Sequence, residues 1–528
     1  MQRDTATQRD GRGLVHLLLA DQQRLTAVER FAERHDAGDL APTSAPYRDL
    51  IPLSEPREGE QYSFEVDLDA CTGCKACVTA CHTMNGLDES EVWRQVGIVL
   101  SDEADAPFSQ TITTACHHCA EPACLQGCPA LAYDKDPVTG IVRHLDDQCI
   151  GCQYCVLKCP YDVPKYSASR GIVRKCDMCH GRLSAGEAPA CVNACPNEAI
   201  RITNVARVDV LARAAEGFFL NAAPAPGYTA PTTVYKTKRD LPAILRAGDA
   251  HRVRVEPAHL PLVFMLVLTQ AAVGLATMQA ALSTFASDSL GTTASLGLAA
   301  SSALLGVAGI GVATLHLGRP HLAFRAILGV RTSWLSRETL VFGALAPLLM
   351  LHPVALWLSS SPVLARALGL GAALAGVAAV ACSVMVYVDT RRPFWSAPRT
   401  TALFGLSAVV LGASGASVFA GNGARVLAAV VVVALAAKVV VEVRPLLRSD
   451  GDLARSARVM RGPLASTTLA RLCLAAGIVV VSIAVLVGAV PPLPSVSMTM
   501  FVVATLGEIL ERSLFFRAVA PPRMPGAP

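Results

Sequence analysis

The stretch Cys71-Thr-Gly-Cys74-Lys-Ala-Cys77-Val-Thr-Ala-Cys81 contains four cysteines with the spacing C-x2-C-x2-C-x3-C. The same spacing returns at Cys149-Ile-Gly-Cys152-Gln-Tyr-Cys155-Val-Leu-Lys-Cys159. Three closely spaced thiolates on a tight loop can bind three irons of one cubane, and the fourth cysteine can bind a second cluster. The repeated run therefore predicts paired [4Fe–4S] clusters.

Two further groups of four cysteines have a different spacing. One consists of Cys116, Cys119, Cys124 and Cys128, and the other of Cys176, Cys179, Cys191 and Cys195. A single C-x2-C is also typical of zinc sites, and many cysteines in a secreted protein suggest disulfides. Here 16 of the 18 cysteines fall in four consecutive groups, three of which end in Cys-Pro. This arrangement favours iron–sulfur ligation over both alternatives.

Charge and hydropathy divide the chain near Pro257. Residues 1–257 have a net charge of −7 and residues 258–528 a net charge of +11. An acidic, cysteine-rich half argues against nucleic-acid binding, which requires a basic face.

No secretory signal peptide and no twin-arginine motif is recognisable before the first cysteine group, which favours a cytoplasmic location for this half.

The domain organisation follows from composition. We expect an amphipathic helix in residues 1–40 and a Pro-rich connection, together residues 1–60, and then the cluster domain at residues 61–220. The stretch 64–68 alternates like a short strand. A Pro-rich and then basic linker (221–257) leads to an all-α membrane domain at residues 258–528.

The second half contains about eight apolar segments that approach the ~20 residues needed to cross a bilayer. The expected spans are 258–283, 292–317, 339–358, 367–388, 401–420, 426–442, 467–490 and 498–516. The sixth span is short and contains Lys438, and the eighth carries Glu508 and Glu511. Lys438 and Glu442 are four residues apart, so they either pair near the membrane edge or contribute to a proton path.

The loops between these spans predict the orientation. The five loops on the side of the cluster domain hold 21 Lys and Arg, whereas the opposite loops hold only Arg366 and Arg425. Positive residues are enriched on the cytoplasmic side of bacterial membrane proteins. The cluster domain and both termini are therefore expected in the cytoplasm, and the protein in the bacterial inner membrane.

Residues 61–204 resemble the four-cluster iron–sulfur subunit of the dimethyl sulfoxide reductase family of molybdoenzymes. The matching stretches are Cys-His-His-Cys-Ala-Glu-Pro-Ala-Cys (116–124), Cys-Ile-Gly-Cys-Gln-Tyr-Cys (149–155) and Lys-Cys-Asp-Met-Cys (175–179). The resemblance implies an α+β ferredoxin-like domain with four [4Fe–4S] clusters.

The resemblance also implies which cysteines share a cluster. The four ligand sets are Cys71, Cys74, Cys77 and Cys195; Cys81, Cys176, Cys179 and Cys191; Cys116, Cys119, Cys124 and Cys159; and Cys128, Cys149, Cys152 and Cys155. The last set would be nearest the membrane. His82 follows Cys81 where relatives have proline, which leaves ligation unaffected.

Residues 258–528 resemble the membrane-anchor subunit of the same family, most closely at His316-Leu-Gly-Arg319-Pro320 and Thr332-Ser-Trp334-Leu-Ser-Arg337-Glu338. The resemblance implies a quinone site that uses His316 and Glu338, with Arg319 and Trp334 nearby. A histidine and a carboxyl group at the membrane edge suit quinol oxidation, which needs a hydrogen-bond partner and a proton acceptor. The alternative is that His316 is an interface residue and Glu338 pairs with Arg337.

These features together predict a non-catalytic electron-transfer and anchor subunit. It would pass electrons between menaquinone or ubiquinone in the membrane and a separate molybdopterin-containing catalytic subunit. Alternatives are a polysulfide-reductase-type anchor, a cytoplasmic sulfite dehydrogenase-type complex that reduces quinone, or a purely structural tether. No haem is expected, because His259, His316 and His352 show no convincing pairing in the sequence.

Overall fold

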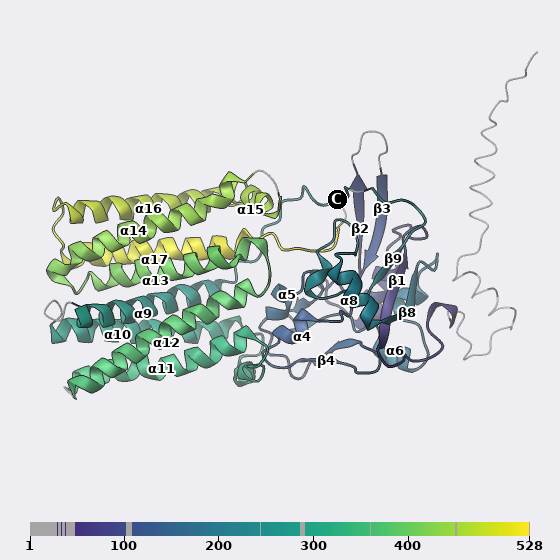
Figure 1. Ribbon diagram of the computed structural model, residues 1–528, viewed down its shortest axis with the longest axis horizontal. Helices are drawn as coiled ribbons and strands as arrows, with labels where there is room; N and C mark the ends of the chain where they lie inside the picture. Colours follow the sequence, from purple (N-terminus) through teal and green to yellow (C-terminus); the bar gives the residue numbers. More distant parts are fainter. Residues whose placement is uncertain are drawn as a thin grey trace, which may run out of the picture.

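The computed structural model describes residues 48–101, 108–242, 244–285, 291–358, 361–448 and 451–526, with three isolated positions before residue 48. Two parts lie end to end (Figure 1): a lobe of small sheets and short helices, and a bundle of long helices. The predicted order of an α+β domain followed by an all-α domain is confirmed. The helix expected in residues 1–40 lies outside the described residues, apart from those isolated positions.

The first sheet joins distant parts of the cluster domain. Its central strand β1 (Glu60–Asp67) pairs antiparallel with β8 (Ile200–Ala206) and parallel with β9 (Val234–Lys236). The stretch 64–68, expected to be a strand, lies within β1 apart from its last residue. The sheet therefore brings the chain before the first cysteine group next to the chain after the last one.

The second sheet includes part of the segment expected to be a linker. β2 (Gln95–Ser101) pairs antiparallel with β3 (Phe108–Thr114) and with β10 (Arg246–Ala247). Since β9 and β10 both belong to the segment 221–257, this segment is not an extended connection. It completes one edge of each sheet.

Short elements surround the cysteines. Two hairpins are formed by β4 (Tyr133–Lys135) with β5 (Val142–His144), and by β6 (Lys165–Ser167) with β7 (Ile172–Arg174). The helices of this domain are α3 (Ala76–Asn85), α4 (Ala123–Gly127), α5 (Tyr154–Lys158), α6 (His180–Ser184), α7 (Ala190–Asn193) and α8 (Arg207–Ala215). All except α8 begin within or next to a cysteine group, so most of the cysteines lie at helix ends and in loops, whereas Cys81 lies within α3.

The membrane domain consists, in the described residues, of eight helices of at least 20 residues: α9 (Leu260–Phe285), α10 (Thr292–Ala313), α11 (Trp334–Trp357), α12 (Pro362–Val388), α13 (Ala397–Ala416), α14 (Ala424–Val443), α16 (Ala465–Leu486) and α17 (Pro494–Arg517). The helices α9 to α12 lie together, and α13, α14, α16 and α17 form a second group (Figure 1). The two groups meet where α9 crosses α13, because a Cβ on Gly274 would lie only 2.0 Å from the Ala408 carbonyl oxygen.

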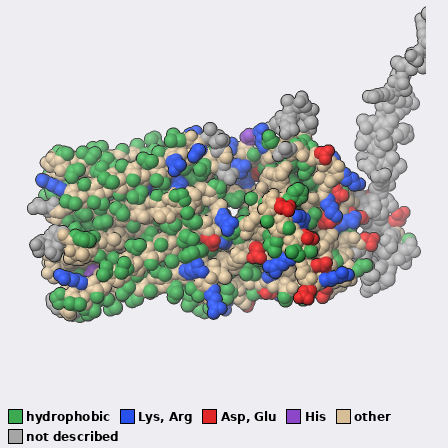
Figure 2. All heavy atoms as spheres, in the orientation of Figure 1, with side chains coloured by type: hydrophobic (Ala, Val, Ile, Leu, Met, Phe, Trp, Pro, Cys, Tyr) green, Lys and Arg blue, Asp and Glu red, His purple; other side chains and the backbone are tan. Residues whose placement is uncertain are grey.

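Six of these helices, as far as the chain is described, are long and apolar enough to cross a membrane: α9, α10, α11, α12, α14 and α16. Figure 2 shows hydrophobic side chains covering the helical part, with arginine and lysine gathered toward the cluster domain. The multi-pass membrane domain is confirmed. The total of eight spans stays a prediction, because α13 and α17 are the more polar helices; α17 alone contains Glu508, Glu511 and Arg512.

Residues 518–526 leave α17 and return to the second sheet. The Ile98 amide donates a hydrogen bond to the Gly526 carbonyl at 3.2 Å, and the Gly526 amide donates to Asp249 Oδ1 at 3.2 Å. A Cβ on Gly97 would lie 1.8 Å from the Pro525 carbonyl oxygen, so only glycine permits this approach. The cluster and membrane domains are therefore joined by two segments, 248–259 and 518–526.

Candidate functional site

The first and third cysteine groups fold into the same kind of loop. Gly73 and Gly151, at equivalent positions, have φ of +74° and +71°, a conformation that favours glycine. Lys75 and Gln153, two residues further on, have φ of 64° and 59° and precede α3 and α5. The repeated spacing in the sequence is therefore a repeated backbone conformation.

The four ligand sets that the family resemblance implies are numbered here as quartets 1 to 4. Quartet 1 is Cys71, Cys74, Cys77 and Cys195; quartet 2 is Cys81, Cys176, Cys179 and Cys191; quartet 3 is Cys116, Cys119, Cys124 and Cys159; quartet 4 is Cys128, Cys149, Cys152 and Cys155. Within each quartet the thiols are close enough to interact electrostatically. Thiols of different quartets interact as well, so the assignment of each cysteine to one cluster stays a prediction of the family resemblance.

Contacts between neighbouring quartets give their order. Cys77 of quartet 1 interacts with Cys191 of quartet 2, and Cys176 of quartet 2 interacts with Cys116 of quartet 3. The buried Tyr133 interacts with thiols of both quartet 3 and quartet 4. The four quartets therefore form a row that runs from 1 to 4.

Two quartets enclose cavities. All four cysteines of quartet 3 line one cavity, and all four cysteines of quartet 4 line another. No set of three or more His, Cys, Asp or Glu side chains in the described part of the chain closes around a single metal ion. Thiols spread around a cavity fit a cubane better than they fit one tetrahedral zinc ion.

Backbone amides also point at the sulfurs. The amides of Ala132, Gly151, Met178 and Ala199 lie 3.2–3.4 Å from Sγ atoms of Cys128, Cys149, Cys176 and Cys195. Such hydrogen bonds stabilise thiolates and help to set cluster potentials.

Burial raises the pKa of the Cys81 and Cys124 thiols to about 12, so ligation at these positions must release protons. The donor set fits iron–sulfur clusters.

Two buried cations lie between quartets: Lys175 begins the stretch Lys-Cys-Asp-Met-Cys (175–179), whereas no local pattern in the sequence marks Arg94. The Arg94 side chain, 2% exposed, interacts with Cys77 of quartet 1 and with Cys81, Cys176 and Cys191 of quartet 2. Lys175, also 2% exposed, interacts with thiols of quartets 2 and 3. A cluster with four thiolate ligands is anionic, so these cations compensate charge that would be costly to bury alone.

Quartet 4 lies directly on the membrane domain. The Arg319 amide donates to the Ile150 carbonyl at 3.1 Å, within the loop of quartet 4. Ser333 Oγ, just before α11, donates to the Gly127 carbonyl at 2.7 Å. A Cβ on Gly318 would lie 2.1 Å from the Gly171 carbonyl oxygen, so the two backbones are in close contact.

The helix α5, which contains Cys155 of quartet 4, packs into the same interface. Tyr154 OH donates to the Val386 carbonyl at 2.9 Å, near the end of α12. Lys158, 3% exposed, forms an ion pair with Asp389 at 2.6 Å. The interface is thus fixed by hydrogen bonds on both sides of quartet 4.

His316 lies at the end of α10, half-buried, with its ring against the backbone of Cys152 in quartet 4. Its ring packs edge-to-face on His259, with centroids 5.2 Å apart, and His259 in turn packs on Phe516. The sequence offered no reason to pair these histidines. Two axial haem ligands would approach one iron from opposite sides, and edge-to-face rings in contact do not fit that arrangement.

Glu338 lies on the first turns of α11 and is 6% exposed. Its partner is Ser383 Oγ of α12, which donates a hydrogen bond to Glu338 Oε1. The alternative that Glu338 pairs with Arg337 does not hold, because Arg337 donates to backbone carbonyls of Val330 and Arg331. No ion pair of Glu338 occurs in the described residues, and intramembrane carboxyl groups of this kind are functional candidates.

The other two predicted quinone residues have different contacts. Arg319 Nη1 donates to the Asp146 carbonyl at 2.7 Å, and the side chain is directed at the cluster domain. Trp334 begins α11 and is covered by the Arg337 guanidinium, 4.4 Å from its ring centroid.

His316 and Glu338 are separated by aromatic rings. His316 packs on His259, His259 packs on Phe516, and Phe516 packs on Tyr387, which interacts with Glu338. The structure therefore brings both residues to the same end of the membrane domain, with these rings between them.

A second cluster of polar groups, the charge network, lies inside the group formed by α13, α14, α16 and α17. Its members are Ser407, Lys438, Glu442, Arg471, Glu508, Glu511 and Arg512, all buried. Lys438 forms an ion pair with Glu508, contacts Glu511 at 3.3 Å, and lies 3.8 Å from Glu442. Arg471 contacts Glu442 at 2.8 Å and Glu508 at 3.0 Å. The expected pairing of Lys438 with Glu442 is thus a minor part of a larger network.

Comparisons with known proteins agree with the division of the chain into an iron–sulfur part and a membrane part. Residues 108–205 match the family described as "4Fe-4S dicluster domain", and residues 256–517 match "DMSO reductase anchor subunit (DmsC)". The B subunit of the anaerobic dimethyl sulfoxide reductase of Haemophilus influenzae is 38% identical over 191 residues, which are 34% of this chain and 91% of that protein.

Two relatives from Escherichia coli cover the same part. The B subunit of its anaerobic dimethyl sulfoxide reductase is 35% identical over 186 residues, 33% of this chain and 88% of the relative. The formate dehydrogenase-O iron–sulfur subunit is 32% identical over 169 residues, 29% of this chain and 56% of the relative. The chain therefore belongs to the dimethyl sulfoxide reductase family, as an iron–sulfur electron-transfer subunit joined in one polypeptide to a multi-pass membrane anchor of the DmsC type.

Proposed function

We propose that this protein passes electrons between membrane quinone and a separate molybdopterin-containing catalytic subunit through four [4Fe–4S] clusters. One observation carries the proposal: the chain just after His316 lies on the loop of quartet 4, where the Arg319 amide donates to the Ile150 carbonyl at 3.1 Å. The quartet that ends the row is therefore the one in contact with the candidate quinone residues. Quartet 1, at the other end, is the expected exit toward the catalytic partner.

The residues at the membrane edge suit proton-coupled electron transfer. Oxidation of a quinol releases two electrons and two protons, and the clusters, when bound, accept electrons one at a time. The imidazole of His316 can hydrogen-bond a ring oxygen, and the Glu338 carboxyl group can accept a proton. Burial, with Arg392 nearby, lowers the pKa of His259, which favours the neutral form of this neighbour of His316.

The partner and the direction of flow belong to the proposal as well. Named relatives are B subunits of dimethyl sulfoxide reductases, which favours a molybdopterin partner that accepts electrons from menaquinol or ubiquinol. The match to the DmsC-type anchor favours this interpretation over a polysulfide-reductase-type anchor. A sulfite dehydrogenase-type complex would use the same four clusters in the reverse direction, and the co-purifying large subunit distinguishes the two.

The quinone site is tested by His316→Arg and Glu338→Gln. Each variant should retain its clusters and its place in the membrane, while cluster reduction by a menaquinol analogue slows by roughly 10²–10⁴-fold, the usual contribution of acid–base groups. Dithionite should still reduce all clusters, because it bypasses the site. The readout is stopped-flow absorbance of the clusters together with their EPR spectra.

His352→Gln provides the matched control. His352 is buried on the same helix as Glu338, but fourteen residues further along α11, about 21 Å from it along the axis. Its replacement should leave quinol-driven reduction unchanged. Wild-type kinetics in both His316→Arg and Glu338→Gln would show that quinol is oxidised elsewhere, with Lys438 and Glu508 the next residues to replace.

The cluster count is tested separately. Protein purified without oxygen should contain about sixteen iron and sixteen acid-labile sulfur atoms per chain, as four cubanes require. Cys152→Ser should alter or remove one EPR signal, that of quartet 4, and leave the other three. Bound zinc with little iron, or loss of all four signals in this single variant, would contradict the ligand sets.

A further inference from the structure

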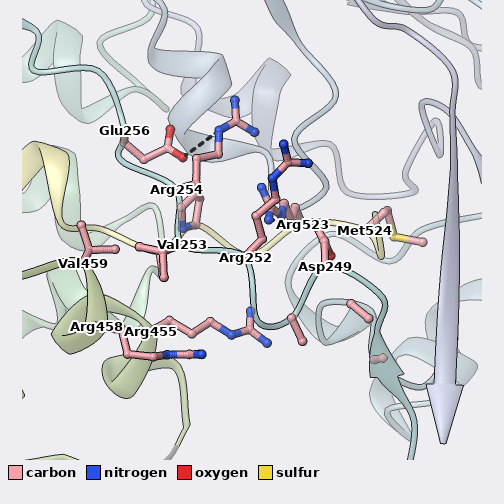
Figure 3. Close-up of a pocket in the computed structure, with 15 residues that line it drawn as sticks. Asp249, Arg252, Val253, Arg254, Glu256, Arg455, Arg458, Val459, Arg523 and Met524 are labelled. Atoms are coloured by element: carbon pink, nitrogen blue, oxygen red, sulfur yellow. Dashed lines mark ion pairs between the residues drawn. The ribbon is translucent and has the colours of Figure 1, made fainter. Parts of the chain in front are cut away.

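An open cavity lies where the cluster and membrane domains meet. Three chain segments form most of its lining, together with Ala222: residues 247–256 before α9, the helix α15 (Gly451–Arg461), and residues 520–524 after α17. We call it the arginine pocket, because its lining includes Arg252, Arg254, Arg455, Arg458 and Arg523. In Figure 3, Arg455 and Arg458 extend from α15, while the other three arginines come from the two connecting segments.

The arginine pocket has an excess of positive charge. Its five guanidinium groups face two carboxylates, Asp249 and Glu256. Both carboxylates already have a partner: Asp249 pairs with Arg523 at 2.7 Å, and Glu256 lies 3.6 Å from Arg254. The lining therefore carries a net charge of +3.

The three remaining arginines are Arg252, Arg455 and Arg458. None of them forms an ion pair with a carboxylate in the described residues. Like charges held around one cavity repel each other, and an anion bound between them removes that repulsion. Guanidinium groups bind phosphate oxygens through paired hydrogen bonds, which makes a phosphate group the chemically matched anion.

The position of the pocket identifies the source of the phosphate. The helix α15 is amphipathic: Ala454, Ala457, Val459 and Met460 are buried, whereas Arg455, Arg458 and Arg461 are exposed. It lies between α14 and α16, at the ends of these membrane helices that face the cluster domain (Figure 1). Basic pockets next to the ends of membrane helices are typical binding sites for the headgroups of anionic lipids.

We propose that the arginine pocket binds the phosphate of an anionic phospholipid headgroup, such as that of phosphatidylglycerol or cardiolipin. The acyl chains would lie along the apolar surface of the neighbouring membrane helices. The headgroup would touch both segments that join the two domains, as well as α15, so the lipid fixes the cluster domain on its anchor. This role does not depend on the quinone site.

The test uses the full chain, purified in detergent, stripped of lipid, and with its iron content verified. Native mass spectrometry then measures the binding of added phosphatidylglycerol, cardiolipin or phosphatidylcholine. The double variant Arg455→Gln/Arg458→Gln should bind the two anionic lipids at least tenfold more weakly than the unmodified chain. Arg455→Lys/Arg458→Lys, which retains charge but loses the paired hydrogen bonds, should give an intermediate affinity.

Arg461→Gln is the matched control, since Arg461 is exposed on the same helix but does not line the pocket. It should bind lipid like the unmodified chain. Equal binding by the double glutamine variant, equal loss in the control, or equal binding of phosphatidylcholine would each overturn the proposal. A further arm adds inorganic phosphate. If millimolar phosphate alone occupies the pocket and displaces the lipid, the site serves soluble phosphate and the lipid assignment is wrong.

Discussion

Replacing Lys438 should expose how strongly the charge network holds the membrane domain together. Lys438 is fully buried on α14 and lies among the carboxylates of Glu442, Glu508 and Glu511. In Lys438→Met these carboxylates lose their shared cation while the side chain keeps a similar volume. Removing one partner of a buried ion pair costs about 3–5 kcal/mol, because the remaining charge is left buried.

The remaining contacts place the expected cost at the lower end of this range. Arg471 still contacts Glu508 at 3.0 Å and Glu442 at 2.8 Å, so neither carboxylate is left without a cation. We therefore expect the free energy of unfolding to fall by about 3 kcal/mol, roughly a hundredfold in the unfolding equilibrium. The double variant Lys438→Met/Glu508→Gln removes both charges together and should recover most of this loss.

The assay is denaturant unfolding in detergent micelles, followed by the fluorescence of Trp395. This residue stacks on Phe515 at 5.3 Å, beside the network, so it reports on the helices concerned. The other three tryptophans, Trp93, Trp334 and Trp357, are first replaced by Phe. A shifted midpoint with an unchanged slope measures stability. If the single and double variants lose the same stability, or if neither loses any, the network is not a coupled electrostatic unit.

Three further predictions concern electron transfer and the topology. In Gly318→Ala the added Cβ would lie 2.1 Å from the Gly171 carbonyl oxygen, so the two backbones at the domain interface should move apart. This variant should slow the reduction of the clusters by quinol but not their reduction by dithionite. Gly311→Ala, with open space around its Cβ, is the control, and equal rates in the two variants would contradict the close contact. Arg94→Met removes a cation between quartets 1 and 2, so redox titration should show the potentials of both clusters lowered by roughly 50–100 mV; unchanged potentials would mean that Arg94 has no electrostatic role. Reporter tags at the N-terminus and in 443–463 should report cytoplasm and tags in 359–366 the opposite side, whereas an external N-terminus would reverse the orientation.

Local patterns predicted much of this fold. The cysteine spacing indicated the loops, since Gly73 and Gly151 stand where a left-handed backbone is needed. Hydropathy located all eight long helices to within a few residues. The third helix begins at Trp334 rather than at 339, because the polar residues at its start lie against the cluster domain, which a hydropathy window cannot register.

Contacts between residues far apart in the chain could not be predicted from the sequence. Lys438 weakened the expected sixth span, yet its charge is balanced by Glu508 on another helix, seventy residues away. His259 and His316 are far apart along the chain and meet only because the start of α9 packs beside the end of α10. Arg94 and Lys175 are buried among thiols of different quartets. Each position is set by tertiary packing, so no local periodicity could reveal it.

The two segments that join the domains have a kinetic consequence. When an iron–sulfur subunit and its anchor are separate chains, their docking depends on concentration and can be reversed by dilution. Here residues 248–259 and 518–526 hold the two surfaces together, so docking is an intramolecular event with an effective concentration set by the short connections. If quartet 4 exchanges electrons with membrane quinone as proposed, the rate of that exchange should be independent of protein concentration, even at extreme dilution.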